Sequence, residues 1–186
     1  MRRGRLVSAL LLALAACCGA GCAPAGRGQG AASSTEVRLT LPFVAQVGPH
    51  LCGVACVEML TRCYGRPLGA AALRSLRAEA VATGGVSGAS MKSALESAGY
   101  EVAVYPGTLD RGPAGLFKQV DKGLPVLVMT GAGPRHYCLV AGYDEQKGTI
   151  SLLDPARGRV ELSLPGFEAQ WQAAGYFALL AAPKPA

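Results

Sequence analysis

The chain has 186 residues, a net charge of +6 and a mean hydropathy of +0.29, and 51% of its residues are hydrophobic. It has no dense cluster of lysine and arginine with interleaved aromatic residues, so the composition does not predict nucleic-acid binding. It also has no G-x-x-x-x-G-K-[ST] phosphate loop, so no ATPase is predicted.

The chain begins with a predicted lipoprotein signal peptide, residues 1–16. Arginines at positions 2, 3 and 5 precede an almost wholly apolar run over residues 6–16, which is too short for a permanent membrane span. The sequence Leu-Ala-Ala just before Cys17 resembles a bacterial lipobox, in which the cysteine receives a lipid and becomes the new N-terminus. Lipidation at Cys22, or ordinary secretion, is the alternative.

The predicted lipid places the protein in a bacterial cell envelope. Residue 18 is a cysteine and not the aspartate that retains lipoproteins in the inner membrane, so an outer membrane is favoured where two membranes exist. Residues 17–35 are rich in alanine, glycine and serine and are predicted to be a flexible tether. Residues 36–183 are enough for one domain with its own core, and loss of the three N-terminal arginines lowers the net charge from +6 to +3.

Periodicity and turn residues divide this domain into helices followed mainly by strands. Helices are predicted over residues 52–64, 68–82, 90–98, 112–122 and 167–174. Strands are predicted over residues 37–43, 101–105, 125–130, 136–143, 149–153, 159–164 and 176–181. A helical half followed by an antiparallel sheet indicates the α+β class.

The helix that begins at Cys52 is the centre of the functional prediction. A thiol at a helix N-terminus lies at the positive end of the macrodipole, which lowers its pKa and favours the thiolate. Gly53 is expected to let the backbone turn tightly there. Gln46, six residues before Cys52, offers an amide donor for an oxyanion. The alternative is a buried structural cysteine, because free cysteine is among the most buried residue types.

A base and its orienting group are predicted on neighbouring strands. His136 opens the strand over residues 136–143, and Asp154 follows the next strand in an Asp-Pro pair. If the two strands form a hairpin around residues 144–148, antiparallel pairing returns Asp154 to the level of His136. A carboxylate there holds the imidazole tautomer and stabilises its charged form. A half-buried sheet histidine and a turn-forming Asp-Pro are the alternatives.

Taken in order, these motifs resemble the bacteriocin-processing cysteine peptidase family. The chain contains Q-x(5)-C-G, then an apolar helix ending in C-Y-G, then H-Y-x-L-V-x-G-Y-D and D-P-A-x-G. The resemblance implies a papain-like fold, with the nucleophile helix packed on the sheet, and cleavage of leader peptides after a double glycine. The implied roles are nucleophile for Cys52, base for His136, orienting carboxylate for Asp154 and oxyanion donor for Gln46, with the Cys52 backbone N–H as second donor.

Three departures separate this chain from the transporter-fused members of that family. Leu51 replaces a common aspartate before Cys-Gly, and Cys138 stands where an aliphatic strand residue is usual. No membrane or nucleotide-binding domain follows, so the chain resembles the freestanding exported relatives. Two function classes therefore compete, an exported cysteine endopeptidase and a non-catalytic peptide-binding module that assists peptide export. A papain-like acyltransferase or amidase, such as a peptidoglycan hydrolase, is a more distant alternative.

The family resemblance also implies the substrate class, a peptide or protein with very small residues just before the scissile bond. Bulky walls near the nucleophile would leave room there only for glycine or alanine. The residues predicted to contact the substrate are His50, Gly53, Tyr137 and Trp171. A separate exporter is a further predicted partner. No metal or other cofactor is predicted, and C-x-x-C metal pairs are absent from the sequence.

Overall fold

The computed structural model describes residues 36–131 and 135–185. The predicted signal peptide over residues 1–16, its lipidated Cys17 and the tether over residues 17–35 lie outside the described residues. Within the described part, no helix combines the length and the hydropathy needed to cross a membrane.

The described residues form five helices and seven strands. The helices are α2 (Cys52–Cys63), α3 (Ala70–Thr83), α4 (Gly88–Ser97), α5 (Leu116–Asp121) and α6 (Leu164–Ala173). The strands are β1 (Glu36–Arg38), β2 (Tyr100–Pro106), β3 (Val126–Thr130), β4 (His136–Asp144), β5 (Thr149–Asp154), β6 (Gly158–Ser163) and β7 (Phe177–Pro183). Their types and order are those predicted from the sequence.

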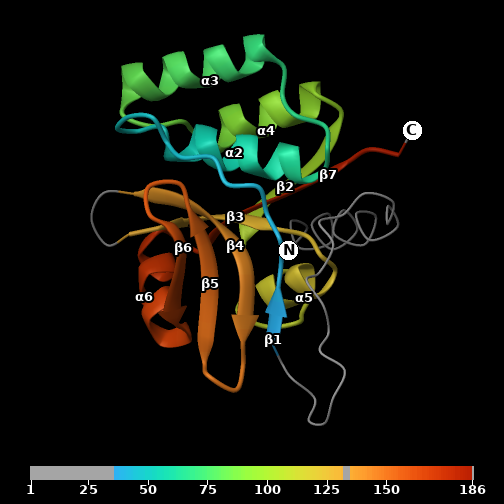
Figure 1. Cartoon of the computed structure of the whole chain (residues 1–186), viewed down its shortest axis with the longest axis vertical. Helices are drawn as coiled ribbons and strands as arrows, with labels where there is room; N and C mark the ends of the chain where they lie inside the picture. Colours follow the sequence, from blue (N-terminus) through green and yellow to red (C-terminus); the bar gives the residue numbers. More distant parts are fainter. Residues whose placement is uncertain (1–35, 132–134, 186) are drawn as a thin grey trace, which may run out of the picture.

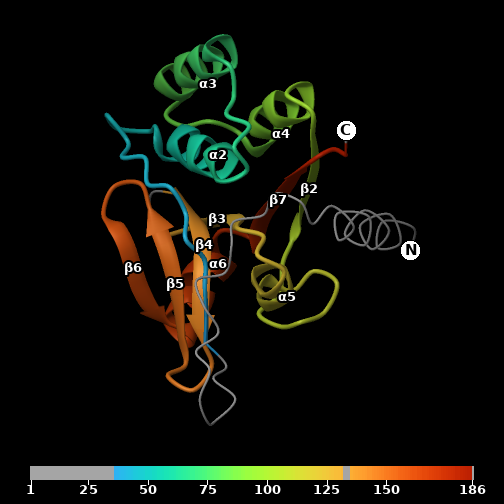
Figure 2. The ribbon, with the colours of Figure 1, turned by 45° about the vertical axis from the view of Figure 1, so that its right-hand side comes forward.

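All seven strands join in one sheet, in the order β2-β7-β3-β4-β5-β6, with β1 paired to β4. Every strand pair is antiparallel. Helices α2, α3 and α4 form a layer on one side of the sheet, and α5 and α6 pack against the other side (Figures 1 and 2). The predicted α+β fold, with the Cys52 helix packed on an antiparallel sheet, is confirmed.

Strand β4 contributes to two hydrophobic cores, because alternate residues of a strand point to opposite faces. Tyr137 and Leu139 belong to the core beneath α2–α4, whereas Cys138 and Val140 belong to the core beneath α5 and α6. Every residue of β4 after His136 is buried. The strand is therefore fixed from both sides, and only its first residue is partly exposed.

Several element boundaries differ from the predicted ones, most of them by one or two residues, and the helix predicted over residues 112–122 is limited to α5. Two of the differences have local reasons. The strand predicted over residues 37–43 is limited to the three residues of β1, because the chain leaves the sheet before Pro42, whose nitrogen cannot donate a hydrogen bond. The helix predicted over residues 167–174 begins three residues earlier. Ser163 caps its start, with Oγ accepting the N–H of Gly166 at 3.2 Å.

Gly142 lets β1 lie against β4. It pairs with Arg38, and the register between β4 and β5 shifts between Val140 and Gly142. A β-carbon on Gly142 would lie 2.3 Å from the carbonyl oxygen of Val37. Because the segment after β1 carries Gln46, this close contact helps to position the chain that leads to the candidate site.

Gly142→Ala is expected to lower the free energy of unfolding by about 1–3 kcal/mol, because the added methyl group would press on backbone that has no rotamer to move to. Urea denaturation measures the loss. Gly48→Ala is the matched control, since a β-carbon there makes an ordinary 3.7 Å contact with Leu51 Cδ1. Equal stabilities of the two variants would contradict the close packing of β1 on β4.

Candidate active site

Helix α2 presents Cys52 at its first residue. The residue before it, Leu51, has no polar side chain to cap the helix, so the first backbone N–H groups lack a side-chain acceptor. The helix is buried from Cys52 through Thr61. Packing thus fixes the helix and holds its positive end at the thiol.

Gly53 brings the start of α2 close to β4. A β-carbon on Gly53 would lie 2.5 Å from Val86 Cγ1 and 3.0 Å from Tyr137 Cδ2. The residue lies inside the helix and does not have a positive φ. The expectation that Gly53 permits a tight turn is therefore wrong. Glycine is required because no side chain fits between the helix and the strand.

Strands β4 and β5 form the hairpin expected from the sequence, with Asp144 paired to Thr149. The register of Leu139 with Leu153 brings Asp154 opposite Cys138, on the face that Cys138 shares with His136, and His136 Nε2 lies 2.8 Å from Asp154 Oδ1. The Asp154 side chain is fully buried, whereas that of His136 is 26% exposed. The pair therefore has a buried carboxylate and an imidazole that opens to the surface.

Three hydrogen-bond donors hold the Asp154 carboxylate. Besides the His136 ring, the Ala156 N–H donates to Oδ1 at 2.8 Å and Arg157 Nε donates to Oδ2 at 2.6 Å. Burial is the largest influence on this group and favours the neutral acid, but the donors outweigh it and lower the pKa of Asp154. The group is consequently a carboxylate at neutral pH.

The His136 imidazole and the Cys52 thiol shift each other's pKa in opposite directions. Hydrogen bonds with the thiols of Cys138 and Cys52 raise the pKa of His136 to about 11, and Asp154 adds to the effect. Burial is the largest influence on Cys52 and opposes ionisation, but hydrogen bonds with His136 and with the backbone of Tyr137 leave its pKa lowered. These shifts favour a thiolate beside an imidazolium.

Gln46 lies on the segment between β1 and α2. Its backbone N–H donates to the Pro155 carbonyl oxygen at 2.9 Å, which ties the segment to the turn after Asp154. Its Nε2 donates to the Gly48 carbonyl oxygen at 3.1 Å. The second hydrogen of Nε2 is left for another acceptor, and the buried Oε1 has no partner among the described residues.

Two predicted substrate contacts, His50 and Tyr137, lie near the start of α2. His50 is exposed, and its φ of 66° is in the left-handed region. Tyr137 is 8% exposed and packs against Gly53, with its ring edge-on to Phe177 at a centroid distance of 5.7 Å. Tyr137 thus forms part of the floor beneath Cys52, and His50 remains a predicted contact.

Trp171 lies away from the site, and its predicted substrate contact is wrong. Its side chain is fully buried, stacks on Phe167, and donates from Nε1 to the Phe177 carbonyl oxygen at 2.8 Å. Its helix, α6, packs on the side of the sheet opposite to α2. The aromatic character that suggested a cleft wall belongs to a core residue.

The chain matches a known peptidase family. The model of the peptidase C39 family matches residues 40–186. The chain belongs to the peptidase C39 family. This confirms the resemblance seen in the sequence and the prediction of a cysteine peptidase. The comparison with curated proteins found no significant match.

Three solved structures share the fold of this C39 peptidase. A double-glycine motif protease from an AMS/PCAT transporter, in complex with the leader peptide, is 18% identical with a TM-score of 0.60, over 87% of this chain and 98% of that one. The peptidase domain of Streptococcus ComA, a bifunctional ABC transporter, is 23% identical with a TM-score of 0.61, and the match covers 77% of this chain and 98% of that domain. A C39-like peptidase from Bacillus anthracis is 17% identical with a TM-score of 0.61, and the match covers 81% of this chain and 99% of that one.

A groove of about 220 Å³ lies beside the first turns of α2. It is lined by Val44, Ala45, Gln46, Val47, Leu51, Val54, Ala55, Glu58 and Arg77. The negative charge of its one acidic residue, buried Glu58, is balanced by ion pairs with Arg77 at 3.2 Å and with Arg62 at 2.5 Å. Val47, 83% exposed, stands on its rim. Mostly apolar walls beside Gln46 suit an apolar side chain of a ligand.

Two further residues contact the His136–Asp154 pair and were not predicted from the sequence to do so. Cys138 lies two residues after His136, so it shares the same face of β4, and its Sγ lies within 4.8 Å of a ring nitrogen. Arg157 lies three residues after Asp154 in the turn before β6 and binds its second oxygen. The strand period of two and a basic residue inside an Asp-Pro turn were the signals for these positions.

His136, Cys138 and Asp154 each place one potential metal ligand within 4.8 Å of the others. In this C39 peptidase, however, the Asp154 carboxylate already binds His136 through Oδ1 and the Arg157 guanidinium through Oδ2. A metal cation would have to displace a proton from the imidazole and approach a fixed positive charge. The donor set therefore favours an acid–base pair over a metal site.

Cys52 is expected to titrate below the ordinary thiol pKa of 9.0, and His136→Ala is expected to raise its pKa, because the partner that stabilises the thiolate is removed. Ultraviolet absorbance of the thiolate against pH, with Cys52→Ala subtracted, measures the titration. The Cys138 thiol is an internal control, since burial raises its pKa. A Cys52 pKa at or above 9.0 in the wild-type protein would contradict the proposed ion pair.

Proposed function

We propose that this C39 peptidase is an exported cysteine endopeptidase in which Cys52 is the nucleophile, His136 the base and Asp154 the residue that orients the base. One observation carries the proposal: the His136 ring bonds to Asp154 through Nε2 at 2.8 Å and lies close enough to the Cys52 thiol to lower its pKa. With Nε2 held by the carboxylate, Nδ1 is the nitrogen that exchanges a proton with the sulfur.

The first half-reaction transfers an acyl group to Cys52. The thiolate attacks the carbonyl carbon of the scissile bond, a C–S bond forms, and the carbonyl oxygen takes the negative charge. We assign the free Nε2 hydrogen of Gln46 and the Cys52 backbone N–H as donors to this oxyanion. The C–N bond then breaks, and the His136 imidazolium gives its proton to the leaving amine.

The second half-reaction releases the acyl group. His136, now neutral, removes a proton from a water molecule as the water oxygen attacks the thioester carbon. The C–S bond breaks, the carboxylic acid product leaves, and the thiolate and imidazolium are restored. Asp154 stays ionised throughout because its donors lower its pKa, so it keeps the ring in one tautomer and stabilises its charge.

We infer that the substrate is an extended peptide with glycine or alanine just before the scissile bond. The leader peptide bound by the AMS/PCAT relative supports a leader-like substrate, with a separate exporter as the further partner. The groove beside Gln46 and Leu51 supports recognition through an apolar side chain. A strongly acidic leader is not required, because the net charge without the N-terminal arginines is only +3.

We also propose the cellular arrangement from the sequence alone. Residues 1–16 would direct export, Cys17 would carry the lipid, and residues 17–35 would tether the peptidase domain over residues 36–183 at the membrane surface. Cysteine at position 18 favours the outer membrane where two membranes exist.

Cys52→Ala and His136→Ala are each expected to abolish peptide turnover with the fold intact, because they remove the nucleophile and the base. Asp154→Asn is expected to impair turnover less, since an orienting residue often costs less than the groups it serves. Gln46→Ala is expected to cost about two to three orders of magnitude. Product formation by mass spectrometry and circular dichroism of each variant provide the measurements.

Unchanged turnover in Cys52→Ala would remove this mechanism. The peptide-binding module would be supported instead by two results together: the wild-type protein binds peptides without cleaving any of them, and a thiol reagent labels its Cys52 only slowly.

Peptides with Gly-Gly or Ala-Gly before the cut are expected to be processed, whereas valine or leucine as the last residue before the bond is expected to stop cleavage. A peptide-library digest read by mass spectrometry tests this, with the Cys52→Ala protein as blank. Efficient cleavage after large or charged residues would overturn the proposed specificity. No cleavage of any peptide, with Cys52 still reactive, would favour an acyltransferase or a peptidoglycan substrate.

The full-length protein is expected to fractionate with membranes and to carry lipid on its mature N-terminus. Cys17→Ser is expected to release it or to block its processing, because the acceptor sulfur is lost. Detergent partitioning and mass spectrometry of the mature N-terminus give the result. A soluble, unlipidated wild-type protein would contradict the proposed anchor.

A further inference from the structure

The turn that connects β5 to β6 contacts both halves of the candidate site. Its first residue, Asp154, binds His136, and the carbonyl oxygen of Pro155 accepts the backbone N–H of Gln46 at 2.9 Å. Inside the turn, the Arg157 N–H donates to the Asp154 carbonyl oxygen at 3.2 Å, and Gly158 has a positive φ of 80°. A shift of this turn would move the orienting carboxylate and the proposed oxyanion donor together.

We propose that Arg157 is a positioning residue of the peptidase reaction, which holds the Asp154 carboxylate, and through it the His136 imidazole, in the orientation that favours the Cys52 thiolate. The inference rests on the proposed Cys52–His136–Asp154 mechanism. Nothing in it requires Arg157 to touch the substrate.

The two oxygens of Asp154 have different partners, which makes Arg157 necessary. Oδ1 accepts two hydrogen bonds, from His136 Nε2 and from the Ala156 N–H, both at 2.8 Å. Among the described residues, Arg157 Nε is the only donor to Oδ2, at 2.6 Å. The Asp154 side chain has no exposed surface while Arg157, itself 64% exposed, lies against it. Without Arg157, Oδ2 would lose its charged donor, and a water molecule in that place would bring no positive charge.

Loss of the Arg157 donor would weaken the ion pair between the Cys52 thiolate and the His136 imidazolium in two ways. The carboxylate would rotate toward other donors, which moves Oδ1 away from the His136 ring. Its pKa would also rise, because burial favours the neutral acid when donors are lost. Either change removes negative charge from the imidazolium, so less thiolate forms at Cys52 at a given pH.

The His136–Asp154 pair has charged and ionisable neighbours on the elements around it. Cys52 and Cys56 face the pair from α2, and Cys138 faces it from β4. Arg135 precedes the first residue of β4, and Arg157 comes from the β5–β6 turn. Burial raises the pKa of Cys56 and Cys138, so both stay neutral thiols at neutral pH.

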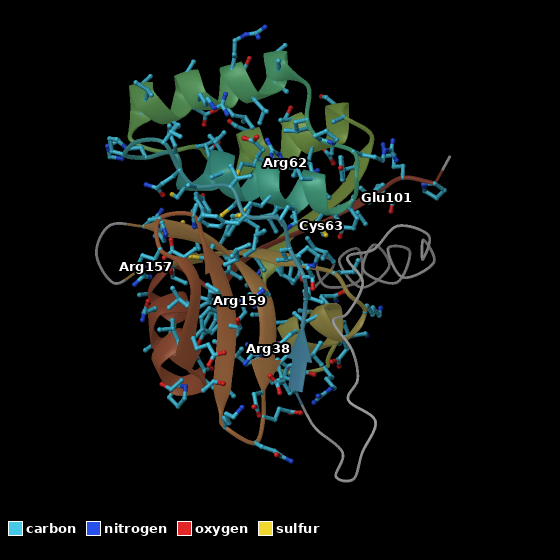
Figure 3. The ribbon with its side chains drawn as sticks, in the orientation of Figure 1. Arg38, Arg62, Cys63, Glu101, Arg157 and Arg159 are labelled. Carbon is cyan, nitrogen blue, oxygen red and sulfur yellow. The ribbon has the colours of Figure 1, made fainter. Side chains whose placement is uncertain are left out.

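Arg159 provides a matched control, two residues further along the same hairpin (Figure 3). It is also an exposed arginine, but it binds Ser151 Oγ at 2.8 Å and the Leu39 carbonyl oxygen at 3.0 Å. Replacing either arginine by alanine removes one positive charge from the hairpin. Only the Arg157 variant removes a donor from Asp154.

The test is the rate of Cys52 alkylation by iodoacetamide across the pH range, followed by mass spectrometry of the Cys52 peptide. It needs no known substrate, and the buried Cys56 and Cys138 serve as slow internal references. Arg157→Ala is expected to lower the rate at neutral pH by about tenfold and to move the rise of the profile to higher pH. Arg157→Lys is expected to restore part of the rate, and Arg159→Ala to stay within about twofold of wild type.

The outcomes separate the positioning role from the mechanism that it serves. A profile of Arg157→Ala that matches Arg159→Ala, in proteins with equal melting curves, would overturn the role of Arg157 and leave the ion pair standing. A wild-type rate no higher than that of His136→Ala would overturn the ion pair, and the role of Arg157 with it. If Arg157→Ala loses its structure globally, Arg157→Met takes its place, because methionine keeps the apolar stem but has no donor for Asp154 Oδ2, and an unchanged profile in that variant overturns the proposal.

Discussion

The bond between His136 and Asp154 depends on one irregularity in the sheet, a β-bulge in β4. Near the hairpin turn, Gly142 pairs with Ser151, but beyond the bulge Leu139 pairs with Leu153. Opposite residues of an antiparallel pair point to the same face, so the bulge moves Asp154 to the face shared by Cys138 and His136. Regular pairing from the turn would place Asp154 opposite Leu139, with its carboxylate directed toward the core beneath α2–α4.

The sequence predicted the residue types of the site, but it did not predict the full geometry that brings them together. A cysteine at a helix start, a histidine at a strand start and an aspartate after the next strand each follow from local pattern, and a simple hairpin already brings the last two to the same level. The bulge, however, cannot be counted from residue periodicity. Gly142 was the only local indication of it, because a glycine inside a strand often accompanies a bulge or a close backbone approach.

The incorrect expectations share a different cause. Periodicity reports that a residue is buried, but this protein has two cores separated by the sheet, and nothing local distinguishes them. Trp171 was predicted to contact the substrate from its aromatic character, and no local pattern showed that it belongs to the core on the other side of the sheet. Gly53 was assigned to a turn because its packing partners, Val86 and Tyr137, are distant in the sequence. Arg157 was overlooked for the opposite reason: its partner is only three residues away, but a basic residue in an Asp-Pro turn does not by itself show that the carboxylate is buried.

The three free thiols around the site indicate how the fold selects one nucleophile. Cys56 is one helical turn after Cys52, but its thiol donates to the Tyr137 carbonyl oxygen at 3.3 Å, and burial raises its pKa. Cys138 contacts the His136 ring, yet burial raises its pKa as well. Cys52 alone combines the open N-terminus of α2, backbone donors and the imidazolium, which together outweigh its burial. Proximity to the base is therefore not sufficient by itself. Cys52 differs from Cys138 in adding backbone donors, from Tyr137 and Gly53, to its interaction with His136, whereas the Cys56 thiol donates to a carbonyl oxygen.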